Sequence, residues 1–262
     1  MRGWNAANCH QPEGSLTHWL RTALDLALPP VCCFCRRVCQ PVPGYPGICQ
    51  TCLSGLPWRY GRDRFLPDLL PQTAGNSQQL TSLICAMFYR SPVREALIRL
   101  KFGDAPELSV ALGSLLSGSI RYIRPRPTAL VAVPLHEDRM KQRGYNQAAM
   151  LVLQMSRQSG LPDMSAGLIR CRMTLRQSEL TGRDARWSNM TDAFDLNLPF
   201  WQGWLNERAG RRDLRTEHFL LIDDVLTTGA TVDAAAQPLL RLGCRVSGLV
   251  VASDQGGARP RC

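Results

Sequence analysis

The chain of 262 residues is 45% apolar and 20% charged, a balance that excludes a disordered protein and allows a sizeable core. No apolar run reaches the roughly 18 residues that a bilayer-spanning helix needs, so no membrane span is expected. The formal net charge is +10 and 29 of the 31 cationic residues are arginine, which favours an anionic partner such as phosphate, nucleotide or nucleic acid; a solvated basic surface would have the same composition.

Residues 1–30 are predicted to form a tail and one amphipathic helix. Residues 1–11 lack the basic-then-apolar pattern of a secretory signal. Between Leu16 and Leu28 apolar residues recur at helical spacing and are interrupted by His18, Arg21 and Asp25, as expected for a helix with one polar face. The sequence therefore predicts a cytoplasmic protein.

Residues 31–60 carry two CxxC pairs, and residues 61–80 after them are predicted to be a linker. The pairs are Cys32 with Cys35 and Cys49 with Cys52, and each can present two thiolates to one metal. Prolines and glycines between them predict turns. Four sulfur ligands suit a structural zinc ion in a small ribbon, while disulfides are disfavoured in the cytoplasm. Cys33 and Cys39 are spare, and either could replace one of these ligands.

Residues 81–254 are predicted to form an α/β domain, followed by a disordered tail, 255–262. Apolar runs of strand type cover residues 82–89 and 129–133, and helical periodicity covers residues 92–101 and 108–116. After the second strand comes a loop, 134–144, whose cations Arg139, Lys141 and Arg143 could hold pyrophosphate. A basic, solvated turn is the alternative. Asn146 is predicted to cap the next helix, which runs to about residue 156.

Residues 176–186 are polar and rich in arginine, including Arg176 and Arg183. A loop of this kind can close over a phosphorylated ligand and exclude water, although a disordered surface loop would have the same composition. The segment 196–217 that follows is longer than a simple connector, and its role stays open.

The most informative motif lies within residues 218–231. A continuous apolar run, Phe219–Ile222, predicts a strand covered on both faces, and Asp223 and Asp224 follow it directly. Small and hydroxyl residues come next, before a helix and a further strand at 245–252. This loop at a helix N-terminus suits a phosphate group, and the two carboxylates suit ribose hydroxyls. The loop residues are Thr227, Thr228, Gly229, Ala230 and Thr231.

This motif resembles the phosphoribosyl-pyrophosphate (PRPP) fingerprint of type I phosphoribosyltransferases. Together with the double CxxC, the Leu100–Phe102 segment and the residues 134–147 and 176–194, it resembles the ComF/GntX family of competence and DNA-utilisation proteins across roughly residues 16–253. The resemblance implies a parallel sheet flanked by helices behind a zinc ribbon, and a role in DNA uptake or in the use of external DNA as a nutrient. It also implies that Asp223, Asp224 and the threonine loop bind PRPP.

Two functions follow from this resemblance. In the first, the protein is a phosphoribosyltransferase in which PRPP binds with Mg²⁺, Asp223 and Asp224 hold the ribose, and arginines stabilise the departing pyrophosphate. In the second, the same site senses a nucleotide without catalysis, while the ribbon and basic surface contact single-stranded DNA or competence-machinery proteins. The sequence identifies neither an acceptor base nor the oligomeric state.

Overall fold

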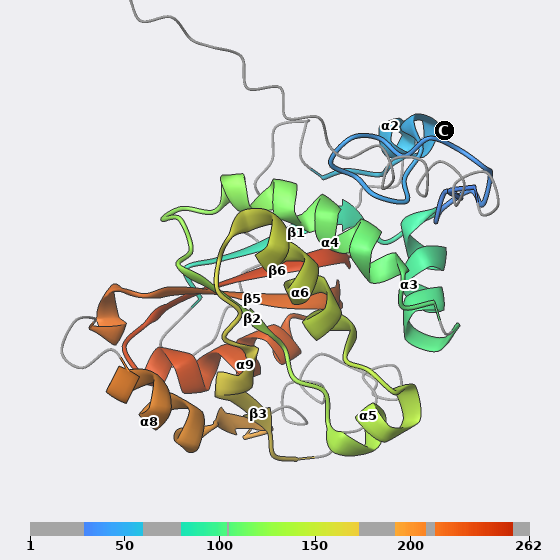
Figure 1. Ribbon diagram of the computed structural model, residues 1–262. Coiled ribbons are helices and arrows are strands. Elements are labelled where there is room, and N and C mark those ends of the chain that lie inside the picture. Colours follow the sequence, from blue (N-terminus) through green and yellow to red (C-terminus); the bar gives the residue numbers. More distant parts are fainter. Residues whose placement is uncertain (1–28, 60–79, 104, 173–191, 208–212, 254–262) are drawn as a thin grey trace, which may run out of the picture.

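The computed structural model (Figure 1) describes residues 29–59, 80–103, 105–172, 192–207 and 213–253. The predicted helix before residue 29, most of the predicted linker at 61–80, the arginine-rich loop with Arg176 and Arg183, and the predicted tail after residue 254 lie outside these ranges.

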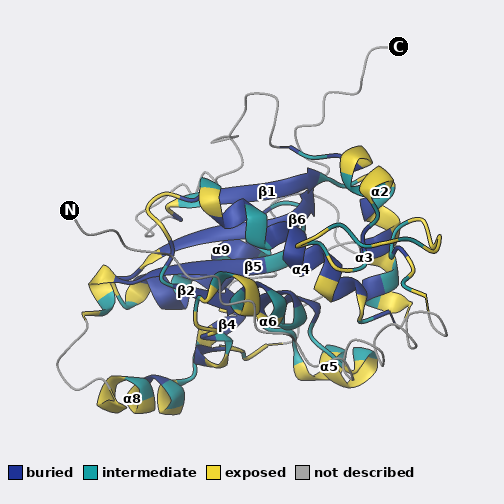
Figure 2. Ribbon diagram, turned by 45° about the horizontal axis from the view of Figure 1, so that its top comes forward, coloured by how far each residue is buried: buried dark blue, intermediate teal, exposed yellow. Residues whose placement is uncertain are grey.

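A four-stranded parallel sheet forms the centre of the molecule. Its strands are β1 (Ser82–Phe88), β2 (Ala129–Ala132), β5 (His218–Leu226) and β6 (Arg245–Ser253), in the order β1-β6-β5-β2. The strands are almost entirely buried (Figure 2), which is why they read as continuous apolar runs rather than alternating ones. The predicted α/β class, a parallel sheet flanked by helices behind a small cysteine-rich region, is confirmed.

Helices cover both faces of this sheet, and each face has its own core. Helices α3 (Val93–Phe102), α4 (Leu108–Ser119) and α6 (Gln147–Ser159) lie on one face, and α9 (Ala230–Arg241) lies on the other. Alternate residues of a strand point to opposite faces. In β5, Leu220 and Ile222 therefore pack under α4 and α6, while Phe219 and Leu221 pack against α9.

The cysteine-rich region is attached to the α3 and α4 side of the molecule (Figure 1). It contains short bridges, Val31 with Val38 and Val42 with Tyr45, and one helix, α2 (Gln50–Gly55). Ile48 is completely buried in the core shared with α3 and α4. The guanidinium of Arg99 on α3 donates to the carbonyl oxygen of Cys33 at 2.9 Å. The region thus packs on the helix whose last turn reaches the candidate site.

The segment 196–217, left open by the sequence, begins at the end of β4 (Phe194–Leu196). Its described residues contain α8 (Leu198–Glu207) and the short helix η5 (Leu214–Thr216). The strand pairs with β3 (Leu168–Arg170) in a separate antiparallel sheet. Trp201 is buried against Phe219, and its indole donates to the carbonyl oxygen of Gly167 at 2.8 Å. Leu198 and Leu205 are exposed on α8.

The expectation of a loop throughout residues 134–144 was wrong, because residues Glu137–Arg143 form a short helix, α5. The ring nitrogen Nδ1 of His136 accepts from the backbone N–H of Asp138 at the first turn, and Gly144 ends the helix at φ 78°, a conformation that glycine adopts without strain. Asn146 caps α6 as predicted, with its side-chain oxygen 3.0 Å from the N–H of Ala148. No helix in the described ranges is both long and apolar enough to span a membrane.

Candidate functional site

Asp223 and Asp224 lie in the last half of β5, at the end of the sheet where parallel strands bind ligands. Asp223 is half-buried, and Asp224 is 7% exposed. The backbone N–H of Asp224 donates to Oδ1 of Asp223 at 2.8 Å, which fixes the first carboxylate beside the strand. Two acids are therefore held side by side, one partly open to solvent and one buried.

Lys101 neutralises the buried acid, and sequence reasoning assigned it no role. Its Nζ lies 2.9 Å from Oδ1 of Asp224, and it comes from the last turn of α3, more than a hundred residues away in the chain. A buried carboxylate needs such a partner, because an unpaired charge is costly away from water. The available signals were that Lys101 lies in the Leu100–Phe102 segment of the resemblance and is one of only two lysines in the sequence.

The environment of Asp223 raises its pKa to about 7. Burial is the main cause, and the negative charge of Asp224 adds to it, while Lys101 and Arg170 act in the opposite direction. A carboxyl group with this pKa exchanges its proton close to neutral pH. When ionised, such a group accepts a hydrogen bond from a sugar hydroxyl, and when protonated it donates one.

The threonine loop follows β5 two residues after the acids and leads into α9. The loop was predicted to extend to Thr231, but Ala230 and Thr231 form the start of the helix. Gly229 precedes the helix at φ 88°, a conformation that a residue with a Cβ rarely adopts. Oγ1 of Thr228 accepts from the N–H of Ala230 at 3.4 Å, while Thr227, Thr228 and Thr231 are half-buried. The first N–H groups of a helix have no partner within it and favour an anion. The loop therefore offers main-chain and hydroxyl donors next to the acids.

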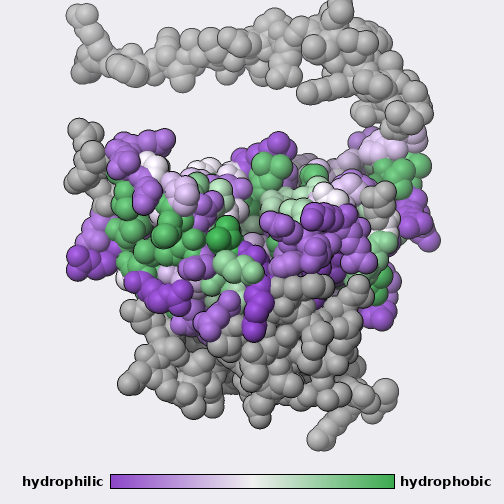
Figure 3. Space-filling view, turned by 90° about the horizontal axis from the view of Figure 1, so that it is seen from below, coloured by the Kyte–Doolittle hydropathy of each residue, from purple (hydrophilic) through white to green (hydrophobic). Residues whose placement is uncertain are grey.

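Two other elements carry cationic side chains close to Asp223 or to the lysine that pairs with Asp224. Arg139 and Arg143, both half-buried, lie on α5, where hydrophilic side chains gather on the lower face in Figure 3. Arg170 at the end of β3 is close to both Arg139 and Asp223. Its pKa is lowered to about 10, chiefly by burial and then by the charge of Arg139, while Asp223 raises it.

Sequence reasoning missed Arg170 because a single arginine after two apolar residues carries no motif. Arg176 and Arg183, which it selected instead, lie outside the described residues. Arg170 is thus close to Asp223 and to Arg139, and Arg143 is close to Lys101. This concentration of positive charge suits a polyanionic group such as pyrophosphate.

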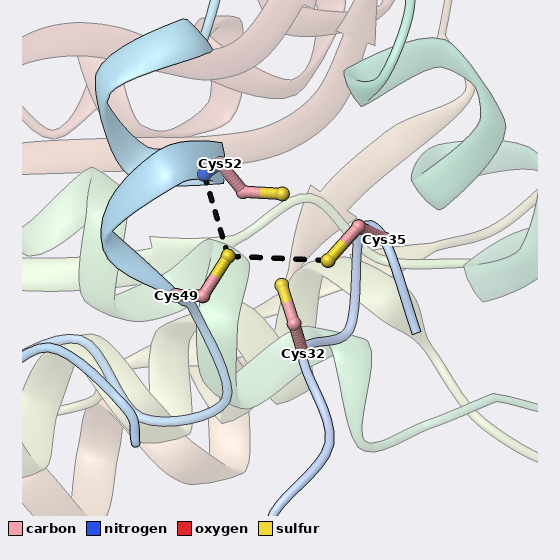
Figure 4. A group of neighbouring side chains, drawn as sticks. All are labelled: Cys32, Cys35, Cys49 and Cys52. Atoms are coloured by element: carbon pink, nitrogen blue, oxygen red, sulfur yellow. Dashed lines mark hydrogen bonds between the residues drawn. The ribbon is translucent and has the colours of Figure 1, made fainter. Parts of the chain in front are cut away.

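The four predicted metal ligands form one cluster (Figure 4). The Sγ atoms of Cys32, Cys35, Cys49 and Cys52 all lie within 4.8 Å of one another, and those of Cys35 and Cys49 are 3.9 Å apart. Tetrahedral coordination with zinc–sulfur bonds of about 2.3 Å places sulfur atoms about 3.8 Å apart. The cluster therefore fits a structural zinc ion, and it leaves no ligand position for a substrate.

The spare thiols are not part of this cluster. Burial raises the pKa of the Cys33 thiol to about 12, and burial also raises the pKa of Cys39. For Cys32, burial acts in the same direction, but the backbone N–H groups of Cys35, Cys49 and Phe34 outweigh it and lower the pKa to about 6. The sulfur of Cys32, and not that of its neighbour Cys33, belongs to the cluster of four, so the geometry favours Cys32 as a ligand.

Among curated proteins, the chain is similar to the DNA utilization protein YhgH of Escherichia coli K12, with 30% identity over 233 residues, 83% of this chain and 94% of that protein. It is 32% identical over 160 residues to Competence protein F of Haemophilus influenzae, which covers 59% of this chain and 65% of that protein. It is 27% identical over 241 residues to Competence protein ComFC of Bacillus subtilis, 92% of this chain and 84% of that protein. No family model matches the chain.

Among solved structures, the adenine phosphoribosyltransferase of Leishmania donovani matches with a TM-score of 0.34 and 14% identity, over 63% of this chain and 75% of that one. The adenine phosphoribosyltransferase of Trypanosoma brucei, in complex with AMP, pyrophosphate and ribose-5-phosphate, matches with a TM-score of 0.34 and 13% identity, over 62% and 73%. These scores are too low to place individual residues. The sequence matches are specific, and they show that the chain belongs to the ComF/GntX family of competence and DNA-utilisation proteins.

Proposed function

We propose that the protein binds PRPP or a related phosphoribosyl ligand and acts in DNA uptake or in the use of external DNA. The observation that carries the proposal is the position of Asp223 and Asp224 near the end of β5, two residues before the loop that leads into α9. Asp224 is held there by its ion pair with Lys101. Carboxylates suit the ribose hydroxyls and the loop suits the 5′-phosphate. The names of the relatives in Escherichia coli and Haemophilus influenzae support the biological role.

Each group of residues has a distinct task in this proposal. Asp223 and Asp224 hold the ribose, Thr227–Thr231 hold the 5′-phosphate through main-chain and hydroxyl donors, and the arginines of α5 and β3 face the pyrophosphate. Mg²⁺ bound with PRPP would neutralise the pyrophosphate oxygens, and its preference for oxygen ligands fits the carboxylate of Asp223. If pyrophosphate leaves, the same arginines stabilise its developing charge.

Calorimetry with PRPP and Mg²⁺ tests this proposal. We expect one binding site per chain, with ribose 5-phosphate binding more weakly because it lacks the pyrophosphate that the arginines contact. Pyrophosphate release is then measured with a panel of purine and pyrimidine bases. Release with any base identifies an enzyme, binding without release identifies a sensor, and the absence of binding to both ligands overturns the proposal.

Single-stranded DNA is a second candidate partner, and one cluster of side chains favours it. The guanidinium carbon of Arg90, which is exposed, lies 5.0 Å from the centre of the half-buried Phe88 ring at the end of β1, and the buried Arg59 lies 4.7 Å from the same ring. Arginine and aromatic side chains together suit the phosphates and bases of a single strand.

Replacing Arg90 with glutamate is expected to weaken the binding of a labelled oligonucleotide and to make the binding less dependent on salt. Titrations at several salt concentrations measure both effects. Arg157→Glu is the control, because Arg157 is also exposed but lies on α6 rather than beside Phe88. Equal losses in the two variants would indicate only a general effect of net charge and would remove this cluster as a DNA site.

A further inference from the structure

Phe102 is the most unusual surface residue near the candidate site. Its side chain is 65% exposed, and every other aromatic side chain in the described part of the chain is buried or half-buried. An aromatic ring is costly to leave in water, because its burial is worth more than that of most side chains. An exposed ring beside a ligand site therefore needs an explanation.

The backbone around Phe102 is held in place by the site itself. Phe102 ends α3, directly after Lys101, whose Nζ pairs with Asp224. The hydroxyl of Tyr145 donates to the carbonyl oxygen of Leu100 at 2.7 Å. The N–H of Gly103 closes the last turn by donating to the carbonyl oxygen of Arg99 at 2.8 Å. The Phe102 side chain is therefore exposed even though the backbone that carries it is held by hydrogen bonds.

One face of the ring is already covered by a cation. The guanidinium carbon of Arg143 lies 5.1 Å from the ring centre of Phe102, and a nitrogen of the same guanidinium donates to the amide oxygen of Gln147 at 3.2 Å. Because the ring remains 65% exposed, its other face is open to solvent. A ring supported on one face and open on the other can stack with a planar ligand.

The order of atoms in a nucleotide matches the order of groups at the site. The 5′-phosphate suits the loop before α9, and the hydroxyls on C2 and C3 suit the acids of β5. C1, which carries the base, is bonded to C2. Asp224 is in contact with Lys101, the residue before Phe102, so the acids lie where α3 ends. A base attached to C1 would therefore extend from the sugar toward the end of α3, and not toward the phosphate loop.

We propose that Phe102, supported by Arg143, is a stacking platform for the aromatic base of a nucleotide whose ribose and phosphate occupy the phosphoribosyl site. This inference rests on the proposed function and deepens it, because it supplies the base-binding surface for which the sequence offered no candidate. The ligand class is a purine or pyrimidine nucleoside 5′-monophosphate. Phe102 contributes affinity for the base and none for the sugar phosphate.

Calorimetry with AMP and ribose 5-phosphate on the full chain separates the two contributions. We expect wild-type protein to bind AMP roughly 5- to 100-fold more tightly than ribose 5-phosphate, the range that stacking of one base provides. Phe102→Ala should lose most of this difference and leave the affinity for ribose 5-phosphate unchanged. Phe102→Tyr should keep it. Leu198→Ala is the control, because Leu198 is 61% exposed on α8 and should affect neither ligand.

Each other outcome overturns the proposal in a recognisable way. Equal affinity of wild-type protein for both ligands would mean that no base is bound. Equal losses for both ligands in Phe102→Ala would mean that Phe102 only supports the sugar-phosphate site. If the variant binds a single-stranded oligonucleotide more weakly but AMP normally, Phe102 contacts a DNA strand instead. If wild-type protein binds PRPP but neither AMP nor ribose 5-phosphate, this inference fails and the proposed function stands. If it binds none of the three ligands, both fail.

Discussion

Replacing Cys49 with serine is expected to reduce bound zinc from one ion per chain to almost none and to unfold the cysteine-rich region. Cys49 is central to the cluster: its Sγ lies 3.9 Å from that of Cys35 and accepts from the N–H of Cys52 at 3.4 Å. Structural zinc contributes about 10–16 kcal/mol to the folding of small zinc domains. Elemental analysis measures the zinc, and hydrogen exchange across residues 31–59 measures the unfolding.

Cys33→Ser is the matched control for this experiment. Cys33 is adjacent to a predicted ligand, but its sulfur is outside the cluster of four. The control variant should keep its zinc. Loss of zinc from Cys33→Ser together with its retention in Cys49→Ser would show that the ligand set is wrong.

The consequences of zinc loss should extend to α3. The region packs on this helix through Ile48, which is fully buried in the shared core, and through the 2.9 Å hydrogen bond from Arg99 to Cys33. The same helix carries Lys101 to Asp224. We therefore expect Cys49→Ser to increase hydrogen exchange in the last turn of α3 as well.

Replacing both Asp223 and Asp224 with asparagine is expected to abolish detectable binding of PRPP while the zinc content stays unchanged. Hydrogen bonds to a charged group contribute about 1.5–3 kcal/mol each, so the loss of two corresponds to an affinity roughly 100- to 10,000-fold lower. In addition, Lys101 loses the carboxylate with which it pairs at 2.9 Å. Calorimetry measures the binding, and elemental analysis measures the zinc.

Asp213→Asn is the control for replacing an aspartate by asparagine outside the site. Asp213 is exposed and precedes η5, which lies before the start of β5, so this variant should bind PRPP like wild-type protein. Normal binding by the double variant would show that the ribose is not held at these acids, and the site assignment would then be wrong.

The pH dependence of binding isolates the role of Asp223. Because its pKa is raised to about 7, the carboxylate that accepts sugar hydroxyls is lost as the pH falls, and affinity should decrease between about pH 8 and 6. The ligand phosphate also titrates near pH 6. The single variant Asp223→Asn retains only the titration of the phosphate, so the difference between the two profiles reports Asp223. Identical profiles would contradict this role.

The stability of the ligand-free protein should decrease as the pH rises, whereas the affinity for the ligand should increase. The pKa of Asp223 rises from 3.8 to about 7 on folding, so the protonated form is favoured in the folded state. Its contribution to stability is fully present below pH 3.8 and is lost as the pH rises through about 7. Asp223→Asn should therefore be more stable than wild-type protein at pH 8, and thermal unfolding at several pH values measures this difference.

The sequence by itself determined the features that depend on neighbouring residues. The apolar runs at 82–89, 129–133, 219–222 and 245–252 predicted the four strands of the main sheet, because a strand buried on both faces needs no polar alternation. The pairs of cysteines predicted the sulfur cluster, since a CxxC turn brings two thiols together regardless of what surrounds it. The position of the threonine loop at the start of α9 was predicted in the same way, because small and hydroxyl residues stand between an apolar run and a helical pattern in the sequence.

Only the tertiary structure decided which distant side chains surround the acids. Lys101 pairs with Asp224, Arg170 lies near Arg139 and Asp223, and Phe102 stacks with Arg143. These contacts join elements that are far apart in the chain, and they depend on the strand order β1-β6-β5-β2. Periodicity and spacing predict which face of an element is buried, but they contain no information about which elements become neighbours, because that is decided by how the whole core packs.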